Sequence, residues 1–342
     1  MKTFVSASLA LCFAAIVIGC SGDAEDNRIQ SIATSNGDPV AVAAARPDVP
    51  IPAQPDDEAS QTTGEAAAES ASQHAVTCLA KAGDVLYVGG AAGVTALTEG
   101  KPERVVEGET VALLAAGGKL WVVQAGMLST LDGATQIVPE FVARLTSAAA
   151  TDLSLFVGSA GEGVFKLADS CLEPASPDWD VIALAATDFG LFAATTEGLF
   201  SFDGERWHRR TPVDSQSAPT ALHYRYPYLY VGGDNQLLRY DGGRWEQFGL
   251  ENGMVVSALG WHDARLYIGG DDGSLATLEG ALLEPVPDPG AGPVHALLRF
   301  DGRLHLATEA GLLQQRYGRF IEIELEEPVK HEPETEPIAS LL

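Results

Sequence analysis

Acidic side chains recur in the turn that follows the second strand of a repeated unit, and carboxylates gathered in this way could bind a cation. The positions are Glu162, Glu197, Asp234, Asp271, Asp272 and Glu309. If the units surround one axis, these turns share a face, here the acidic face, with the connections between units, which add Asp178, Asp180, Asp214, Glu251 and Asp288. Such a face could attract Ca²⁺, a polyamine or a basic protein patch. The alternative is that acids and glycines simply suit exposed turns; we assign no cofactor, with Ca²⁺ kept as the alternative.

Aromatic side chains collect in the turns between the first and second strands, on the opposite face. They are Phe189, Tyr224, Tyr226, Tyr228, Trp261 and Phe300. Contiguous units would place these rings side by side on what we call the aromatic face, and exposed aromatic patches often mark interfaces or sugar platforms. The alternative is that each ring folds back onto its own unit.

The patterns that announce an active site do not occur. The sequence contains no Gly-x-Ser-x-Gly, no His-Glu-x-x-His and no glycine-rich phosphate loop. His223, His262, His295 and His305 occupy different registers of the repeat, so we do not expect them to converge on a metal. A propeller enzyme such as a polysaccharide lyase or glycosidase would need His, Arg or carboxylates at a central mouth, where this chain offers mainly acids. We predict a non-enzymatic protein without a metal site.

Two cysteines of the repeat region, Cys78 and Cys171, could pair outside the cytoplasm. Cys78, however, stands where other units carry an alanine, one residue before an apolar anchor, so it is interpreted as a small buried apolar group. Cys171 lies two units away, after a hairpin turn. We therefore expect no disulfide between them.

A repeat of seven units fixes the elements that hold these residues. The second strand of each unit begins at a leucine, and successive leading leucines are 34 to 38 residues apart: Leu86, Leu120, Leu155, Leu191, Leu229, Leu266 and Leu304. An apolar anchor precedes each leading leucine by seven residues: Leu79, Leu113, Ala148, Leu184, Leu222, Leu259 and Leu297. Asp203-Gly204 and Asp241-Gly242 indicate tight hairpins to a fourth strand.

The patterning within the strands predicts how the units pack. Second strands such as Leu229-Tyr230-Val231-Gly232 are apolar on both faces, whereas the last strand around Phe320 to Leu325 alternates. Sheets whose inner strands are covered twice and outer strands once stack around an axis. The fold class is therefore all-β, a seven-bladed β-propeller of four-stranded antiparallel blades. We predict that residues 76–325 form it, closed by complete blades without a shared strand, as a monomer.

These units resemble the propeller repeats in periplasmic sensor regions of bacterial two-component regulators. The resemblance covers residues 76–325 and is carried best by Leu229 to Gly232, Leu237 to Gly242 and Trp245 to Phe248. No kinase, DNA-binding or transmembrane segment is expected after them, so only the propeller carries over. The scaffold of the outer-membrane barrel assembly machinery is another propeller lipoprotein with which this chain can be compared. That family tends to have eight blades and Leu-Tyr-Ala-Leu-Asp signatures, and the seven units counted here weigh against it.

The N-terminal region reads as an export and anchoring signal. Lys2 precedes an apolar run from Phe4 to Gly19, as in a secretory signal peptide, predicted over residues 1–19. Val17-Ile18-Gly19-Cys20 looks like a bacterial lipobox, which implies cleavage before Cys20 and its acylation. Several acyl chains give stable attachment to a lipid bilayer. Ser21, rather than Asp, implies the outer membrane of a Gram-negative cell envelope, facing the periplasm or the surface.

The remaining segments are predicted to be a tether and a tail. Residues 20–75 are rich in Asp, Glu, Ala, Pro and Ser and nearly lack aromatics, which is typical of a disordered linker. Residues 326–342 are an acidic tail.

The charge of the whole chain narrows its partners. With 21 Lys and Arg against 47 Asp and Glu, the formal net charge is −26, which excludes a general nucleic-acid-binding role. The resulting hypothesis is a membrane-anchored envelope lipoprotein whose propeller binds another envelope protein or a glycan. The alternatives are a scaffold of an outer-membrane assembly or sensing complex, and the propeller enzyme weighed above.

Overall fold

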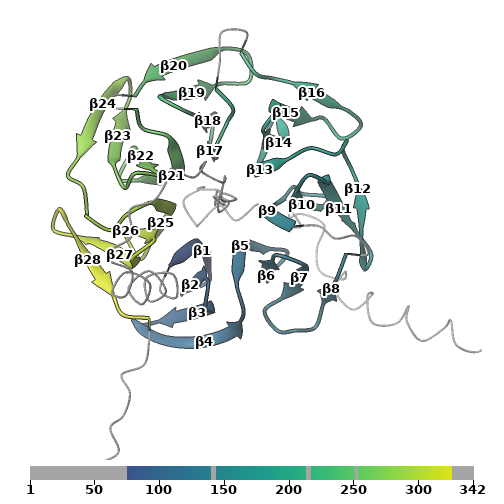
Figure 1. Ribbon diagram of the computed structural model, residues 1–342, viewed down its shortest axis with the longest axis horizontal. Coiled ribbons are helices and arrows are strands. Elements are labelled where there is room, and N and C mark those ends of the chain that lie inside the picture. Colours follow the sequence, from purple (N-terminus) through teal and green to yellow (C-terminus); the bar gives the residue numbers. More distant parts are fainter. Residues whose placement is uncertain (1–74, 140–143, 213–216, 251–252, 326–342) are drawn as a thin grey trace, which may run out of the picture.

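The computed structural model describes residues 75–139, 144–212, 217–250 and 253–325. These residues form seven four-stranded antiparallel sheets, each built from four consecutive strands, and the sheets stand like blades around one axis (Figure 1). The predicted all-β seven-bladed propeller is thereby confirmed. Cys20, the predicted signal and linker, the acidic tail, Asp214 and Glu251 lie outside the described residues.

The first three blades run through the sequence in order. Blade 1 contains β1 (Val76–Ala82), β2 (Val85–Gly90), β3 (Gly93–Thr98) and β4 (Lys101–Glu107). Blade 2 contains β5 (Thr110–Ala116), β6 (Lys119–Gln124), β7 (Met127–Thr130) and β8 (Gln136–Ile137). Blade 3 contains β9 (Arg144–Ala150), β10 (Leu155–Ala160), β11 (Gly163–Ala168) and β12 (Cys171–Pro174).

The last four blades follow the same plan. Blade 4 contains β13 (Val181–Thr187), β14 (Gly190–Thr195), β15 (Gly198–Phe202) and β16 (Trp207–Arg209). Blade 5 contains β17 (Ala221–Arg225), β18 (Tyr228–Gly232), β19 (Gln236–Tyr240) and β20 (Trp245–Gly249). Blade 6 contains β21 (Val256–His262), β22 (Arg265–Gly270), β23 (Leu275–Glu279) and β24 (Leu282–Val286). Blade 7 contains β25 (Val294–Phe300), β26 (Arg303–Thr308), β27 (Gly311–Arg316) and β28 (Arg319–Ile323).

The ring closes by packing of complete blades. Blade 1 starts with its innermost strand and blade 7 ends with its outermost, so no strand is shared between them. One apolar cluster joins Val76 and Leu79 of blade 1 to Ala296 and Leu298 of blade 7. Closure by complete blades, as predicted, is confirmed, and burial of this cluster is what drives it.

The second strand explains why its sequence recurs. Its leading leucine faces the preceding blade and the next residue faces the following blade: Leu229 belongs to the core between blades 4 and 5, and Tyr230 to the core between blades 5 and 6. The glycine that ends the motif allows close approach. A Cβ on Gly269 would lie 2.6 Å from Cγ1 of Val294, the first residue of the next blade's inner strand.

The outer strands and hairpins behave as their sequences predict. In β28 only Phe320 and Ile323 are partly buried and the other residues are exposed, whereas the second strand β22 is buried over most of its length. Gly204 and Gly242 adopt φ angles of 105° and 95° in the hairpins between third and fourth strands, a region that L-residues disfavour. Exposure therefore increases from the axis outward.

Candidate functional site

The acidic turns of the sequence lie at one end of the propeller, because the turns between second and third strands and the connections between blades share that end. Glu162, Glu197, Asp234 and Asp272 are exposed there, and Asp271 and Glu309 are partly buried. Of the acids in blade connections, Asp178, Asp180 and Asp288 are exposed. The face is solvated and negatively charged.

Several of these carboxylates are engaged locally. The Asp272 carboxylate accepts hydrogen bonds from the backbone N–H and hydroxyl of Ser274, and this lowers the pKa of Asp272. Glu309 lies 3.3 Å from Nε2 of His295. Over the described ranges, no group of three or more His, Cys, Asp or Glu is placed to hold a metal ion.

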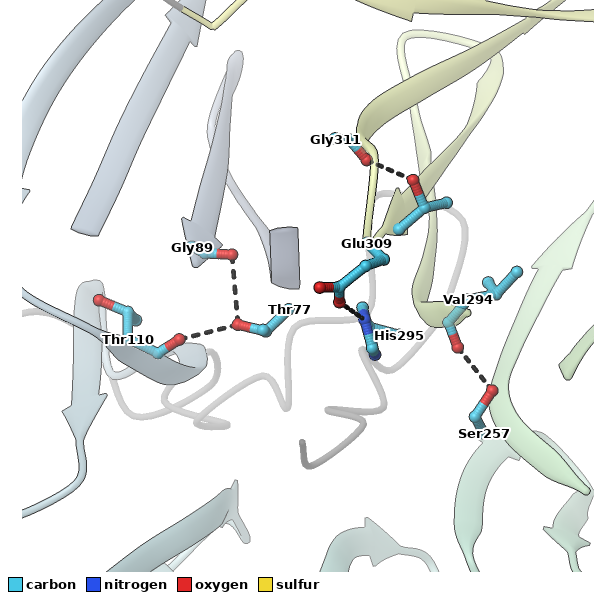
Figure 2. A network of polar contacts seen from close by, with 9 residues as sticks. Thr77, Gly89, Thr110, Ser257, Val294, His295, Glu309 and Gly311 are labelled. Atoms are coloured by element: carbon cyan, nitrogen blue, oxygen red, sulfur yellow. Dashed lines mark hydrogen bonds and ion pairs between the residues drawn. The ribbon is translucent and has the colours of Figure 1, made fainter. Parts of the chain in front are cut away.

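Near the axis on this face, hydroxyl groups connect neighbouring blades (Figure 2). The hydroxyl of Thr77 donates to the carbonyl of Thr110 in the next blade at 2.8 Å, and Ser257 donates to Val294 at 2.6 Å. Thr146 and Thr220 make the equivalent bonds to Val181 and Val256. In blade 7 this position is His295, which turns to Glu309 of its own blade instead.

The aromatic face does not hold its predicted rings in one platform. Tyr224 is buried, and Phe189 packs edge-on against it across the boundary of blades 4 and 5, with ring centroids 6.1 Å apart. Trp261 lies under the guanidinium of Arg225, and Phe300 lies under the ammonium of Lys81.

Two tyrosines near the same turn are exposed to different degrees. Tyr228 is partly buried beneath Arg239, whereas Tyr226 is 69% exposed. Most rings therefore fill the boundaries between blades, and Tyr226 stands out from them.

The histidines occupy separate places. His223, His262 and His305 are buried, and burial lowers the pKa of each, to about 4 for His223 and His305. Nε2 of His262 lies 3.2 Å from a carboxylate oxygen of Asp263.

Cys78 and Cys171 are both free thiols. Cys78 is buried, which raises its pKa to about 12, and it occupies the small apolar position expected for it. Cys171 is exposed.

A cleft at the boundary between blades 7 and 1 was not found by sequence reasoning. It has a volume of about 600 Å³, within the usual range of ligand pockets. Its walls are Lys81, Asp84, Leu86, Leu97, Glu99, Gly100, Phe300, Asp301, Arg303, His305, Gln314, Arg316 and Ile323. We call it the seam cleft, because it lies where the first and last blades meet.

The repeat itself marks this place. The residue after the leading leucine is aromatic in blades 1 to 6, where it packs toward the following blade: Tyr87, Trp121, Phe156, Phe192, Tyr230 and Tyr267. In blade 7 it is His305, which faces Leu86 across the seam cleft. The sequence therefore contains the signal for this cleft: His305 is the one residue at this position of the repeat that is not Phe, Tyr or Trp.

The polar floor of the seam cleft is a chain of three side chains. Nε of Arg316 donates to Oε1 of Gln314, which fixes the amide, and Nε2 of Gln314 then donates to Nε2 of His305 at 2.7 Å. Since Nε2 of His305 accepts, neutral His305 carries its proton on Nδ1. His305 and Gln314 are buried, while Lys81 and Phe300 are partly buried above them.

The charged residues of the seam cleft differ in depth. Asp84, Glu99 and Asp301 are exposed in turns at the rim, as is Arg303. Lys81 reaches deeper and stands over the ring of Phe300, 5.9 Å from its centroid.

The described ranges hold no helical segment with the length and hydrophobicity of a membrane span.

The sequence matches no protein-family model and no curated protein. Solved propellers match the fold. The extracellular domain of the putative hybrid two-component system BT4673 from B. thetaiotaomicron has a TM-score of 0.60 at 13% identity. That match covers 71% of this chain and 38% of the other, so this chain corresponds to well under half of that protein.

Two further propellers show that the likeness is one of fold. Catalytically inactive virginiamycin B lyase from Staphylococcus aureus, solved with quinupristin, has a TM-score of 0.62 at 11% identity, covering 71% of this chain and 94% of the other. The computationally designed Ika8 protein has a TM-score of 0.52 at 16% identity, covering 73% of this chain and 97% of the other. An extracellular domain of a putative two-component system, a lyase and a designed protein share the architecture, so function must be argued from the site.

Proposed function

We propose that this chain is a membrane-anchored lipoprotein of the bacterial cell envelope whose propeller binds a ligand or partner rather than catalysing a reaction. Cys20 supplies the anchor, and Ser21 favours the outer membrane. The fold is similar, at 13% identity, to that of the extracellular domain of a putative two-component system. We take this shared architecture as support for a binding role.

The observation that carries the proposal is the seam cleft. Every other blade boundary receives an aromatic ring from the second strand, whereas this one presents a hydrogen-bonded polar floor inside a cleft of about 600 Å³. A packed ring around one open boundary is a rigid frame for a bound molecule. Rigid sites lose little conformational entropy on binding, which favours affinity.

The anchor is tested by membrane fractionation of Cys20→Ala. We expect the variant to leave the membrane fraction, because acyl chains can then be attached neither to a thiol at position 20 nor to the amino group that cleavage before Cys20 exposes. Cys12→Ala is the matched control, since Cys12 lies inside the apolar run rather than at its end, and it should remain with the membrane. Retention of Cys20→Ala in that fraction would sink the lipoprotein assignment.

A larger partner, an envelope protein or a glycan, is expected at the aromatic face. Tyr226 is the sharper probe there, because Tyr224 is buried and its replacement would disturb the core. Tyr226→Ser should reduce cross-linking to the partner. Tyr317→Ser, which changes a fully exposed tyrosine in the turn between β27 and β28, should not. Equal cross-linking by the two variants would remove Tyr226 from the interface.

A further inference from the structure

The seam cleft has a polar wall whose acceptors are already used. Oε1 of Gln314 accepts from Arg316, and Nε2 of His305 accepts from Gln314. The polar groups left over on this wall are donors: the second amide hydrogen of Gln314, the terminal guanidinium N–H groups of Arg316 and the ammonium of Lys81. A complementary ligand must therefore supply acceptors.

The charges point to an anionic acceptor. Although the chain carries a net charge of −26, Lys81, Arg303 and Arg316 all line this one cleft. None of the three forms an ion pair with another residue in the described ranges. Hydrogen bonds from Arg or Lys to a carboxylate are roughly twice as strong as neutral ones. Lys81 is partly buried, whereas the three carboxylates are exposed, as are Arg303 and Arg316.

The remaining walls are apolar. Leu86 and Leu97 of blade 1 are buried and face the cleft, and Ile323 and Phe300 of blade 7 lie opposite them. Burial of the apolar groups of a ligand against these walls would favour binding. The acids at the rim, Asp84, Glu99 and Asp301, oppose a second negative charge on the ligand.

We propose that the seam cleft binds a small amphipathic monocarboxylate, with its carboxylate toward Lys81, Gln314 and Arg316 and its apolar body against Leu86, Leu97 and Ile323. This assignment rests on the proposed function, because it names the ligand class of a propeller already taken to be a binding module. It requires the ligand to enter by the rim of the aromatic face, where the turns holding Asp84, Glu99 and Asp301 lie.

The test is calorimetric titration of the full chain at neutral pH. The probes are phenylacetate, isovalerate and N-acetyl-phenylalanine, and each is paired with its primary amide, which has nearly the same shape without the charge. We expect at least one acid to bind about tenfold more tightly than its amide. Lys81→Gln should remove that difference. Lys119→Gln, a change of an exposed lysine at the start of β6 in blade 2, should preserve it.

A second variant keeps the test independent of Lys81. In His305→Phe/Gln314→Thr the floor receives a ring, as in blades 3 and 4, and a threonine, as in blades 2 and 6. We expect a folded propeller that binds none of the acids. Binding unchanged in this variant, or amides equal to acids, would overturn the ligand class. If amides bind and acids do not, the ligand class is wrong but the proposed binding role of the propeller survives. If no probe binds and no partner cross-links, both the ligand class and the binding role are wrong.

Discussion

The boundary between blades 4 and 5 and the boundary between blades 7 and 1 occupy equivalent places in the ring but are built differently. At the first, Phe189, Phe192 and Tyr240 meet edge-on with centroids about 6 Å apart, and Trp245 stacks on Tyr240 at 4.6 Å. At the second, His305 and Gln314 replace the ring and its partner, and a cleft of about 600 Å³ remains. The contrast shows how a repeat can keep its fold while one boundary has a cleft where another has packed rings.

The largest expected effect concerns the filled boundary. Phe192 is 1% exposed, and Phe192→Ala should lower the free energy of unfolding by about 3 to 5 kcal/mol, because the rings around it cannot collapse into the space. The measurement is denaturation by urea. His305→Ala at the seam should cost less than half as much, since its surroundings are already open. Equal losses at the two boundaries would contradict the comparison.

Acid stability tests one histidine in a filled boundary, His223, and one at the seam, His305. Burial lowers the pKa of both His223 and His305 to about 4, whereas an unfolded histidine titrates near 6.5. Between those values the unfolded state binds more protons, so stability is full above about pH 6.5 and is lost as the pH falls toward 4. The loss is at most about 3 kcal/mol for each histidine.

His223→Leu measures the share of His223, which pairs with Tyr230 at the boundary between blades 5 and 6, and His305→Phe/Gln314→Thr measures the share of the seam. Leucine occupies the equivalent position in blades 2 and 7, at Leu114 and Leu298, so the first change suits the fold. Among the residues that the structure describes, neither ring nitrogen of His223 has a hydrogen-bond partner, and removal of the ring should also help at neutral pH. Unfolding curves at several pH values should show a smaller acid loss in each variant; curves parallel to wild type would refute the linkage.

Filling the seam should stabilise the protein while abolishing its site. In His305→Phe/Gln314→Thr the new ring faces Leu86, as rings do at the other boundaries, and we expect a gain of about 1 kcal/mol at neutral pH. The hydroxyl of a threonine at 314 has a ready acceptor, because Thr277 in the equivalent position of blade 6 donates to the carbonyl of Glu284. A destabilised double variant would mean that the His305 and Gln314 pair serves the fold rather than a ligand.

The architecture could be predicted from the sequence because the same strand pattern recurs in all seven blades. The leading leucines, their anchors and the Asp-Gly hairpins each fix the register independently, and burial of both faces of the second strand follows from its composition. The positions of the aromatic residues were predicted, but their packing was not, since whether Phe189 points to solvent or to Tyr224 depends on the neighbouring blade.

The seam cleft was missed for a different reason. The signal does not lie in the four histidines as a set, because they share no register, but in the residues that hold the same position in different blades. Measured against Tyr267 or Phe192, His305 is a departure from the repeat that the sequence alone displays. What the sequence could not show is that Lys81, more than 200 residues away, would stand over the same floor once the ring closed.

The smallest effect concerns the links between blades near the axis. The hydroxyl of Thr77 bridges blades 1 and 2, while blade 2 has Val111 and blade 4 has Ile182 at the same position, so the ring tolerates an apolar residue there. Thr77→Val, which keeps the shape, should cost about 1 kcal/mol, the net value of one hydrogen bond. Urea denaturation measures it, with Val111→Ala as a control that removes volume without a hydrogen bond. A loss as large as that of Phe192→Ala would mean that the links near the axis, and not the rings, hold neighbouring blades together; no loss would leave the ring packing alone to do so.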